Sequence, residues 1–291
     1  MPPRRRTPVI PVKKNDAPLP LTLPPGSDFL EHALRPVPPG PRIAWPHPCM
    51  HQIEPLLPKP TSYKMMMLRQ EKAMFLLLVC REIFPHQPRF IRRVYLDLGA
   101  RDYASSVGWF RAHYPEGETF EIHAFEVDPK YRAMGYDKDE RCTFHNAAAW
   151  MSYGCIAMAS MDNFAGAAYG TTFLPSNKTD VVPFSECERL IPKTKNMIGP
   201  IPTVDIAAFM SKTLGLTPSN SFVVLKVDIE GPEWVLMNHL RESGGLRLVK
   251  ETMIECHWDW HKGPFNGIPL SECHRQQRRL REDGVYAHEW Y

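Results

Sequence analysis

The sequence predicts an α/β protein with a doubly wound, mostly parallel sheet in residues 61–291, preceded by a proline-rich extension in residues 1–60. Two observations predict this fold. From about residue 61, short apolar runs alternate with segments of helical periodicity, which is the pattern of successive β-α-β units. The clearest run, 222–228, is apolar as far as Leu225 and leads through a glycine turn into a helical pattern, as expected for a buried parallel strand.

The first elements follow from apolar spacing and from proline. Residues 62–84 carry apolar side chains at helical spacing and end near Pro85, which cannot continue a helix. Residues 94–98 form a short apolar run that predicts a strand. The helical pattern over 103–114 stops at Pro115.

The middle of the chain predicts further strands and a long loop. Residues 120–125 alternate between polar and apolar side chains, so we expect a second strand there, with a short helix after it. A third strand is expected over 142–149 and a further β segment over 153–158. Residues 160–200 are rich in Gly, Asn, Pro and Thr without a period, which indicates either a substrate-side lid or an ordinary surface loop.

The last third repeats the alternation of strands and helices. A helix is predicted over 204–214, with Thr203 as the N-cap, because a threonine hydroxyl can accept a backbone N–H. Pro232 suits the first turn of the helix that follows the 222–228 strand. The pattern then predicts a strand over 246–255, a helix over 270–281 and a final strand over 285–290.

The N-terminal extension differs from the rest of the chain in composition. It holds 17 of the 30 prolines, and proline disfavours both helix and central strand, so residues 1–60 are expected to be largely extended or disordered. Its excess of Lys and Arg includes Arg4–Arg6, whereas the remainder of the chain is close to neutral. Aromatic residues for base stacking are not interleaved with that basic run, which disfavours nucleic acid as a partner.

Cysteine content and apolar run length bear on the compartment. The seven cysteines contain no Cys-x-x-Cys pair and are odd in number, so reduced thiols are the simplest interpretation. No run approaches the roughly 18 apolar residues of a membrane span, and the N-terminus lacks the apolar stretch of a signal peptide. We therefore expect a cytoplasmic protein, with an organelle or the endomembrane system as alternatives. The sequence does not predict an oligomeric state.

Charged residues at the end of the 222–228 strand predict a binding site. Lys226, Asp228 and Glu230 alternate along the chain, so we expect them to share one side of the strand end. Burying three charges is costly unless a ligand or partner groups meet them. In parallel α/β sheets, ligands bind in the cleft beyond the carboxyl ends of the strands.

A second set of residues suggests a nucleoside-containing ligand. Asp97 and Gly99 end the first strand, and Glu126 ends the next one. A carboxylate at that second position can accept both hydroxyls of a ribose. Gly99 is followed by Ala-Arg-Asp, so the Gly-x-Gly-x-x-Gly turn of dinucleotide sites is missing and NAD and FAD are disfavoured.

Glu255 and His257 lie two residues apart at the end of the fifth predicted strand, so they are expected near Asp228. Carboxylates beside an imidazole can tune its pKa for general-base catalysis, or can bind a divalent cation, or can simply hydrogen-bond to it. The spacing from His257 to His261 fits zinc poorly, because Trp-Asp-Trp lies between them.

Several segments together resemble the FkbM-type S-adenosylmethionine-dependent methyltransferases. They are Lys226-Val-Asp-Ile-Glu-Gly-Pro-Glu233, the preceding Ile201-Pro-Thr-Val-Asp205 and the following Met253-Ile-Glu-Cys-His257. A plant and algal branch of the family without assigned activities is similar in two further segments, Tyr95-Leu-Asp-Leu-Gly-Ala-Arg101 with Ser105-Ser106, and Val285-Tyr-Ala-His-Glu-Trp-Tyr291. The resemblance covers roughly residues 90–291.

This resemblance implies a class I methyltransferase fold, which is a Rossmann-like sheet, and S-adenosyl-L-methionine as cofactor. It implies that Asp97, Gly99 and Ala100 contact the methionine part of the cofactor and that Glu126 holds the ribose. Asn146 and Ala147 would lie beside the adenine. It also implies O-methylation of a hydroxyl-bearing small molecule or glycan, without a resident metal. Asp228, Glu230 and His257 would face the acceptor, with Asp228 or His257 as the base.

The chain departs from the family at Arg101 and Tyr103, where FkbM-type enzymes usually have Asn and Gly. Tyr103 is expected to narrow the cofactor pocket, and Arg101 either pairs with neighbouring acids or meets the carboxylate of the cofactor. The alternative function is therefore a methyltransferase-fold binding module without turnover. A third candidate function is that of a glycan- or metal-binding protein, which would use the acids at 228, 230 and 255 with His257.

Overall fold

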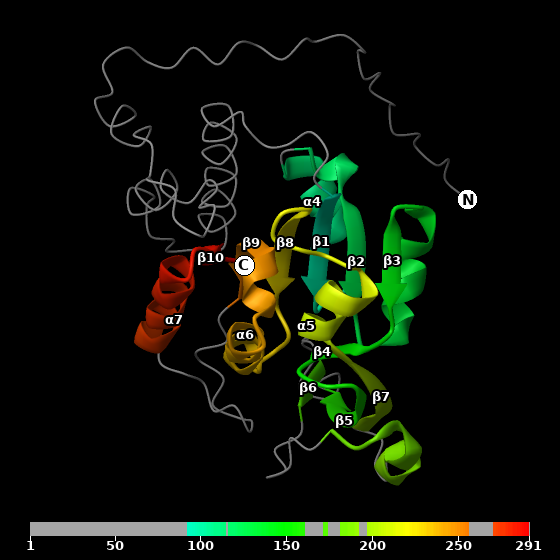
Figure 1. Ribbon diagram of the computed structural model, residues 1–291. Coiled ribbons are helices and arrows are strands. Elements are labelled where there is room, and N and C mark those ends of the chain that lie inside the picture. The colour runs from blue at the N-terminus through cyan, green and yellow to red at the C-terminus, as the bar shows by residue number, and fades with distance from the viewer. Residues whose placement is uncertain are drawn as a thin grey trace, which may run out of the picture. The chain divides into compact units, whose positions relative to one another are not determined.

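The computed structural model describes residues 92–114, 116–160, 171–173, 181–191, 197–255 and 270–290. All of them belong to one compact unit (Figure 1). The extension over 1–60, the predicted helix over 62–84 and His257 lie outside the described residues.

Six parallel strands form the main sheet, as the sequence predicts. They are β1 (Arg92–Leu98), β2 (Glu121–Phe125), β3 (Cys142–His145), β8 (Ser221–Val227), β9 (Val249–Ile254) and β10 (Tyr286–Glu289). Their order is β10-β9-β8-β1-β2-β3, and every pairing is parallel. The chain runs outward from β1 to β3 and then returns to β8 on the other side of β1, so the topological switch point lies between β1 and β8.

Helices cover both faces of this sheet (Figure 1). The α-helices are α4 (Val107–His113), α5 (Ile206–Ala208), α6 (Glu233–Glu242) and α7 (Leu270–Glu282), and α5 continues into the π-helical turn η6 (Phe209–Thr213). Short 3-10 helices are η2 (Gly117–Thr119), η3 (Pro129–Met134), η4 (Tyr136–Lys138), η5 (Phe184–Leu190) and η7 (Gly245–Leu248). The helix after β1 begins at Val107 and not at 103, because Arg101 has a left-handed φ of +46° and the Asp102 carboxylate accepts the N–H of Ser105.

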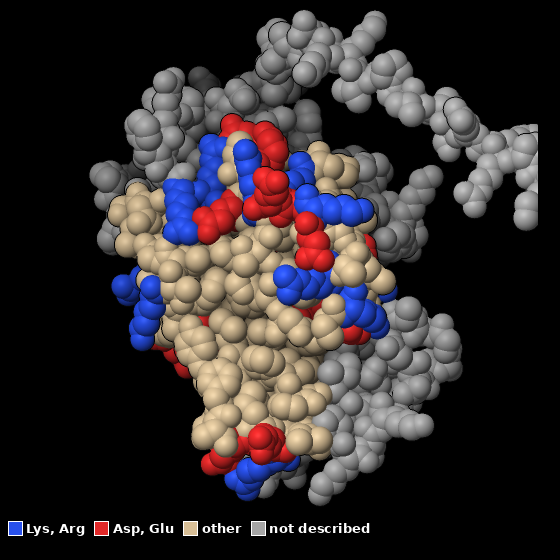
Figure 2. All heavy atoms as spheres, turned by 90° about the vertical axis from the view of Figure 1, so that its right-hand side faces the viewer, with Lys and Arg blue, Asp and Glu red and all other residues tan. Residues whose placement is uncertain are grey.

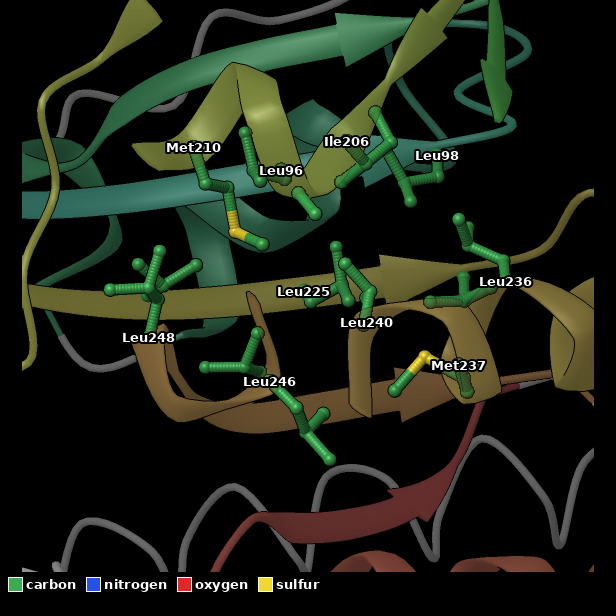
Figure 3. Close-up of a cluster of buried hydrophobic side chains, with 14 of the residues drawn as sticks. Leu96, Leu98, Ile206, Met210, Leu225, Leu236, Met237, Leu240, Leu246 and Leu248 are labelled. Carbon is green, nitrogen blue, oxygen red and sulfur yellow. The ribbon is translucent and has the colours of Figure 1, made fainter. Parts of the chain in front are cut away.

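The larger core cluster lies between the sheet and the helices α5 and α6 (Figure 3). Leu96 and Leu98 of β1 and Leu225 of β8 point toward this side. Tyr95, one position earlier on β1, belongs to the core on the opposite face and stacks on Phe110 of α4 at 3.8 Å between ring centroids. The same alternation puts Asp97 and Lys226 on the α4 side of the sheet.

A second, smaller sheet was not predicted. It consists of β4 (Ala148–Trp150), β5 (Gly154–Ser160), β6 (Thr171–Phe173) and β7 (Met197–Asp205), in the order β4-β7-β5-β6. β5 confirms the β segment expected over 153–158. The single strand expected over 142–149 is wrong, because the turn at Asn146 and Ala147 divides it into β3 of the main sheet and β4 of the second.

The N-cap prediction at Thr203 is also wrong. Thr203 lies inside β7, where its hydroxyl donates to the carbonyl of Ser152 at 2.8 Å. The strand continues to Asp205, and the carboxylate of Asp205 accepts the N–H of Ala208 at 3.0 Å as the cap of α5. The helix therefore begins two residues later than predicted.

The expectation of reduced thiols is wrong for most described cysteines. Cys155 of β5 and Cys187 of η5 form a disulfide, and Cys273 is disulfide-bonded as well. Cys142 carries a free thiol. Within the described ranges, none of the helices has the length and apolarity that crossing a membrane requires.

Candidate functional site

The side chain of Lys226 joins the carboxyl ends of β1 and β8. Its Nζ donates to the carbonyl of Gly99 at 2.8 Å and lies 3.2 Å from a carboxylate oxygen of both Asp97 and Asp228. An ammonium has three N–H donors, and three acceptors surround this one. The ring of Trp290 lies over the ammonium, with its centroid 5.5 Å from Nζ. Lys226 is thus a fixed cation at the switch point.

Burial and neighbouring charges shift the pKa of Lys226 in opposite directions. Burial alone would lower the pKa of Lys226, but the charges of Asp97 and Asp228 outweigh it and raise that pKa. A lysine that acts as a nucleophile or forms a Schiff base needs a lowered pKa. Lys226 is therefore suited to hold other groups in place and not to react.

Asp97 lies beneath the carboxyl ends of the strands and is not exposed there. The side chain is fully buried, one carboxylate oxygen accepts the hydroxyl of Ser106, and the other faces Lys226. Burial raises the pKa of Asp97, and Lys226 and the Ser106 hydroxyl offset part of that rise. Asp97 could therefore influence a ligand at the strand ends only through Ser106 and Lys226.

Gly99 allows the loop after β1 to pass close to the end of β8. It has φ of +80°, and a Cβ built on it would lie 1.7 Å from the carbonyl oxygen of Asp228. The N–H groups of Gly99 and Ala100 both donate to the carbonyl of Phe125 at 3.0 Å. Ala100 is fully buried, and its carbonyl accepts the hydroxyl of Tyr136 at 2.7 Å. The backbone of this turn is fixed on three sides.

Glu126 follows β2 and holds the same turn from the other side. Its two carboxylate oxygens accept the N–H groups of Arg101 at 2.8 Å and Asp128 at 2.9 Å. Burial raises the pKa of Glu126, and these two N–H groups offset part of the rise. Each carboxylate oxygen has a second lone pair, so Glu126 can support the turn and still accept a hydroxyl from a ligand.

Asn146 and Ala147 lie next to Glu126, as expected for neighbouring strand ends. The amide of Asn146 donates to the carbonyl oxygens of Glu126 at 3.0 Å and of Val127 at 2.9 Å. Ala147 is buried, and its N–H donates to the carbonyl oxygen of His145 at 2.9 Å. These contacts fix the backbone between the main sheet and β4.

The loop after β8 differs from the prediction. The strand ends at Val227, and Glu230 has a left-handed φ of +60°, so strand alternation does not extend to Glu230. The structure instead reveals a role for Glu233, which the motifs at the strand ends do not indicate. Its carboxylate accepts the N–H groups of Ile229 at 3.2 Å and Gly231 at 2.9 Å. An acid in the first turn of a helix was the available signal.

Glu255 lies beside the end of β8, where its N–H donates to the carbonyl of Val227 at 2.9 Å. Its sequence partner His257 lies outside the described residues. Within the described part of the chain, no group of three or more His, Cys, Asp or Glu residues is arranged to hold a metal ion.

Tyr103 packs against the segment between β2 and β3. Its hydroxyl donates to Asp139 at 2.9 Å, and its ring meets Tyr136 edge-on at 5.4 Å. A Cβ on Gly135 would lie 2.8 Å from the Cβ of Tyr103, so these two segments of the chain are in close contact. Arg101 is exposed on the turn two residues earlier.

Charged side chains are distributed unevenly on the face shown in Figure 2. Most of them lie in the upper half of this face, and a smaller group lies at its lower end. Acids and bases are mixed in both groups, so neither presents a field of one sign.

No family model matches the chain. No curated protein sequence matches it either, and no solved structure does. The fold and the geometry of the switch point are therefore the observations that bear on function.

Proposed function

We propose that this chain is an S-adenosyl-L-methionine-dependent methyltransferase that acts on a hydroxyl of a small-molecule or glycan acceptor, as the FkbM-like motifs imply. One observation carries the proposal. Acidic residues follow or end three adjacent parallel strands around the switch point: Asp97 in β1, Glu126 after β2 and Asp228 after β8. Cofactors with a nucleoside part bind at this position in sheets of this order.

The residues of the turn fit such a cofactor. Glu126 is nearly buried, its pKa is raised, and its second lone pairs can accept the ribose hydroxyls. Arg101 is exposed on the turn that Glu126 holds, where it can meet the carboxylate of the methionine part. When bound, the cofactor supplies an electrophilic methyl group.

The protein's own task is to orient the acceptor and remove its proton. In this proposal Asp228, held by Lys226, orients the acceptor hydroxyl, and Asp228 or His257 takes the proton. Lys226 keeps the two carboxylates compensated without donating its own proton, because its pKa is raised.

A second candidate function is a binding module with this fold and no turnover. It is favoured by the internal partners of the acids: Asp97 faces Ser106 and Lys226, and both oxygens of Glu126 accept backbone N–H groups. Acids engaged in this way can serve the fold alone.

Thermal unfolding with S-adenosylhomocysteine tests both candidates. At about 100 times a Kd in the micromolar range, a ligand that binds the native state adds about 2.7 kcal/mol, which corresponds to a rise in Tm of roughly 5–10 °C. Adenosine plus homocysteine at the same concentrations is the control. An unchanged Tm with S-adenosylhomocysteine contradicts the enzyme and agrees with acids that serve the fold alone. If the Tm rises, transfer of a labelled methyl group to sugar and phenol hydroxyls supports the enzyme, and binding without transfer supports the silent module.

A further inference from the structure

Residues 181–191 are attached to β5 at three neighbouring points. The backbone groups of Cys155 and Val182 exchange two hydrogen bonds of 2.9 and 3.0 Å. A Cβ on Gly154 would lie 2.3 Å from both the Val182 carbonyl oxygen and a methyl group of Val181, so the segment crosses directly over this glycine. The disulfide from Cys155 to Cys187 adds a covalent attachment to η5.

Val181 packs against the apolar cluster of the second sheet, but apolar burial contributes little to the attachment of η5. None of the seven residues of η5 is buried, and the flanking apolar residue Ile191 is 61% exposed, while Phe184 at its start is 59% exposed. The core cluster of the second sheet contains four buried residues, Ala148, Ile156, Met158 and Ile201. Where apolar burial is this limited, a covalent link supplies a larger share of the stability.

We propose that the disulfide between Cys155 and Cys187 is a structural staple of the second sheet, that it forms as the chain folds in an oxidising compartment, and that its reduction releases η5. The step balances with a disulfide oxidant such as oxidised glutathione. The two thiols lose two protons and two electrons as the S–S bond forms, and the oxidant is reduced to two thiols. This proposal does not rest on the methyltransferase proposal.

The other described cysteines agree with this chemistry. Cys273 is also disulfide-bonded, which is rare in a reducing compartment. Cys142 keeps its thiol, and burial raises its pKa to about 12. A thiol with such a pKa forms little thiolate near neutral pH, so it does not exchange with the disulfide.

The staple also supports one side of the switch-point site. β5 pairs with β7, and β7 pairs with β4, which begins directly after Asn146 and Ala147. β7 itself leads into α5 through Asp205. Loss of the staple therefore loosens the sheet that holds this turn.

Mass mapping of the protein from its own cells tests the compartment. Cells are lysed in denaturant with an alkylating reagent and without reductant, and the digest is searched for cross-linked and alkylated peptides. The proposal predicts a cross-linked peptide that contains Cys155 and Cys187, with alkylation at Cys142. Alkylation of both Cys155 and Cys187 in most of the protein would overturn it.

A double variant, C155A/C187A, tests the staple, with C142A as the matched control. Closing a loop of this length predicts that the double variant loses roughly 5–15 °C in Tm, and trypsin is expected to cleave after Arg189 about tenfold faster. C142A removes a partly buried side chain, so its Tm should fall by less than that of the double variant, and its cleavage after Arg189 should not become faster. If the double variant melts and is cleaved as the wild type is, the disulfide does not hold η5. Should the double variant fail to fold, cleavage after Arg189 is measured on wild-type protein in increasing reductant. Alkylation and mass mapping then report when the bond between Cys155 and Cys187 is reduced, separately from the disulfide of Cys273.

Discussion

Lys226 and Asp97 form an ion pair across the switch point, with 3.2 Å between the ammonium and the carboxylate and both side chains buried. A pair of this kind adds little net stability, because the loss of hydration offsets the attraction. Removing one partner has a larger effect, since it leaves a buried charge without compensation. The pair is therefore a sensitive point of the fold and of the candidate site.

We predict that K226M destabilises the protein by about 3–5 kcal/mol, because Asp97 and Asp228 then face each other without a cation. Urea unfolding of the purified variant measures this loss. K212M, at an exposed lysine, is the control and should change the stability by less than about 0.5 kcal/mol. In D97N/K226M the loss should be smaller than the sum of the single losses. A K226M variant as stable as K212M would show that the ammonium is dispensable.

Gly99 and Gly244 offer a matched pair for the turn after β1. Both have a left-handed φ, +80° and +79°, but a Cβ would meet the Asp228 carbonyl at 1.7 Å only at Gly99, and nothing within 4 Å at Gly244. We predict that G244A loses about 1 kcal/mol through backbone strain, whereas G99A loses more than about 3 kcal/mol because the strands must separate. Equal losses in thermal or urea unfolding would mean that the close approach is not required.

A partly buried pair of histidines predicts loss of stability in acid. His123 of β2 and His145 of β3 are 3.0 Å apart at their ring nitrogens, and burial lowers the pKa of His145 to about 4. Between that value and the unfolded pKa of about 6.5, the unfolded chain binds more protons than the folded one. The contribution is therefore complete above pH 6.5 and is lost as the pH falls toward 4, by about 1–3 kcal/mol.

Unfolding free energies measured from pH 4 to 7 in wild type and H145N check this prediction. The variant should show a flatter profile, because it lacks the titrating group. H113N, at an exposed helical position, should keep the wild-type profile. An H145N profile as steep as the wild type would assign the acid sensitivity to other groups.

The parallel sheet was predictable because its central strands are buried on both faces. Residues 94–98 and 222–227 are apolar at nearly every position, and such runs fit parallel strands between two helical layers. The strand ends then located Asp97, Glu126 and Asp228 without further information. Strand alternation also placed Asp97 and Lys226 on one face.

The second sheet was not predictable, because β7 contains Pro200 and Pro202, which normally indicate a loop. The structure explains how both are tolerated. β4 pairs with β7 only over residues 203–205, so among the described strands both prolines have only β5 beside them. The disulfide could not be predicted either, because its cysteines are 32 residues apart and only the fold brings their Cα atoms to 5.5 Å.

The partners that hold the site depend on tertiary contacts. Ser106 meets Asp97 because α4 packs back against β1, and Trp290 meets Lys226 because β10 is placed at the edge of the sheet. Neither contact follows from spacing along the chain. For Glu126, the position at a strand end was predictable from the sequence. Its hydrogen bonds with the N–H groups of Arg101 and Asp128 were not.

The most direct test of the central claim is isothermal titration of the folded protein with S-adenosylhomocysteine, in wild type and in E126Q. We expect one site with a micromolar Kd in the wild type, and a Kd about tenfold weaker in E126Q, which corresponds to the loss of about 1.4 kcal/mol. Absence of binding heat from folded wild-type protein at about 100 µM would contradict the claim that this switch point binds a nucleoside cofactor.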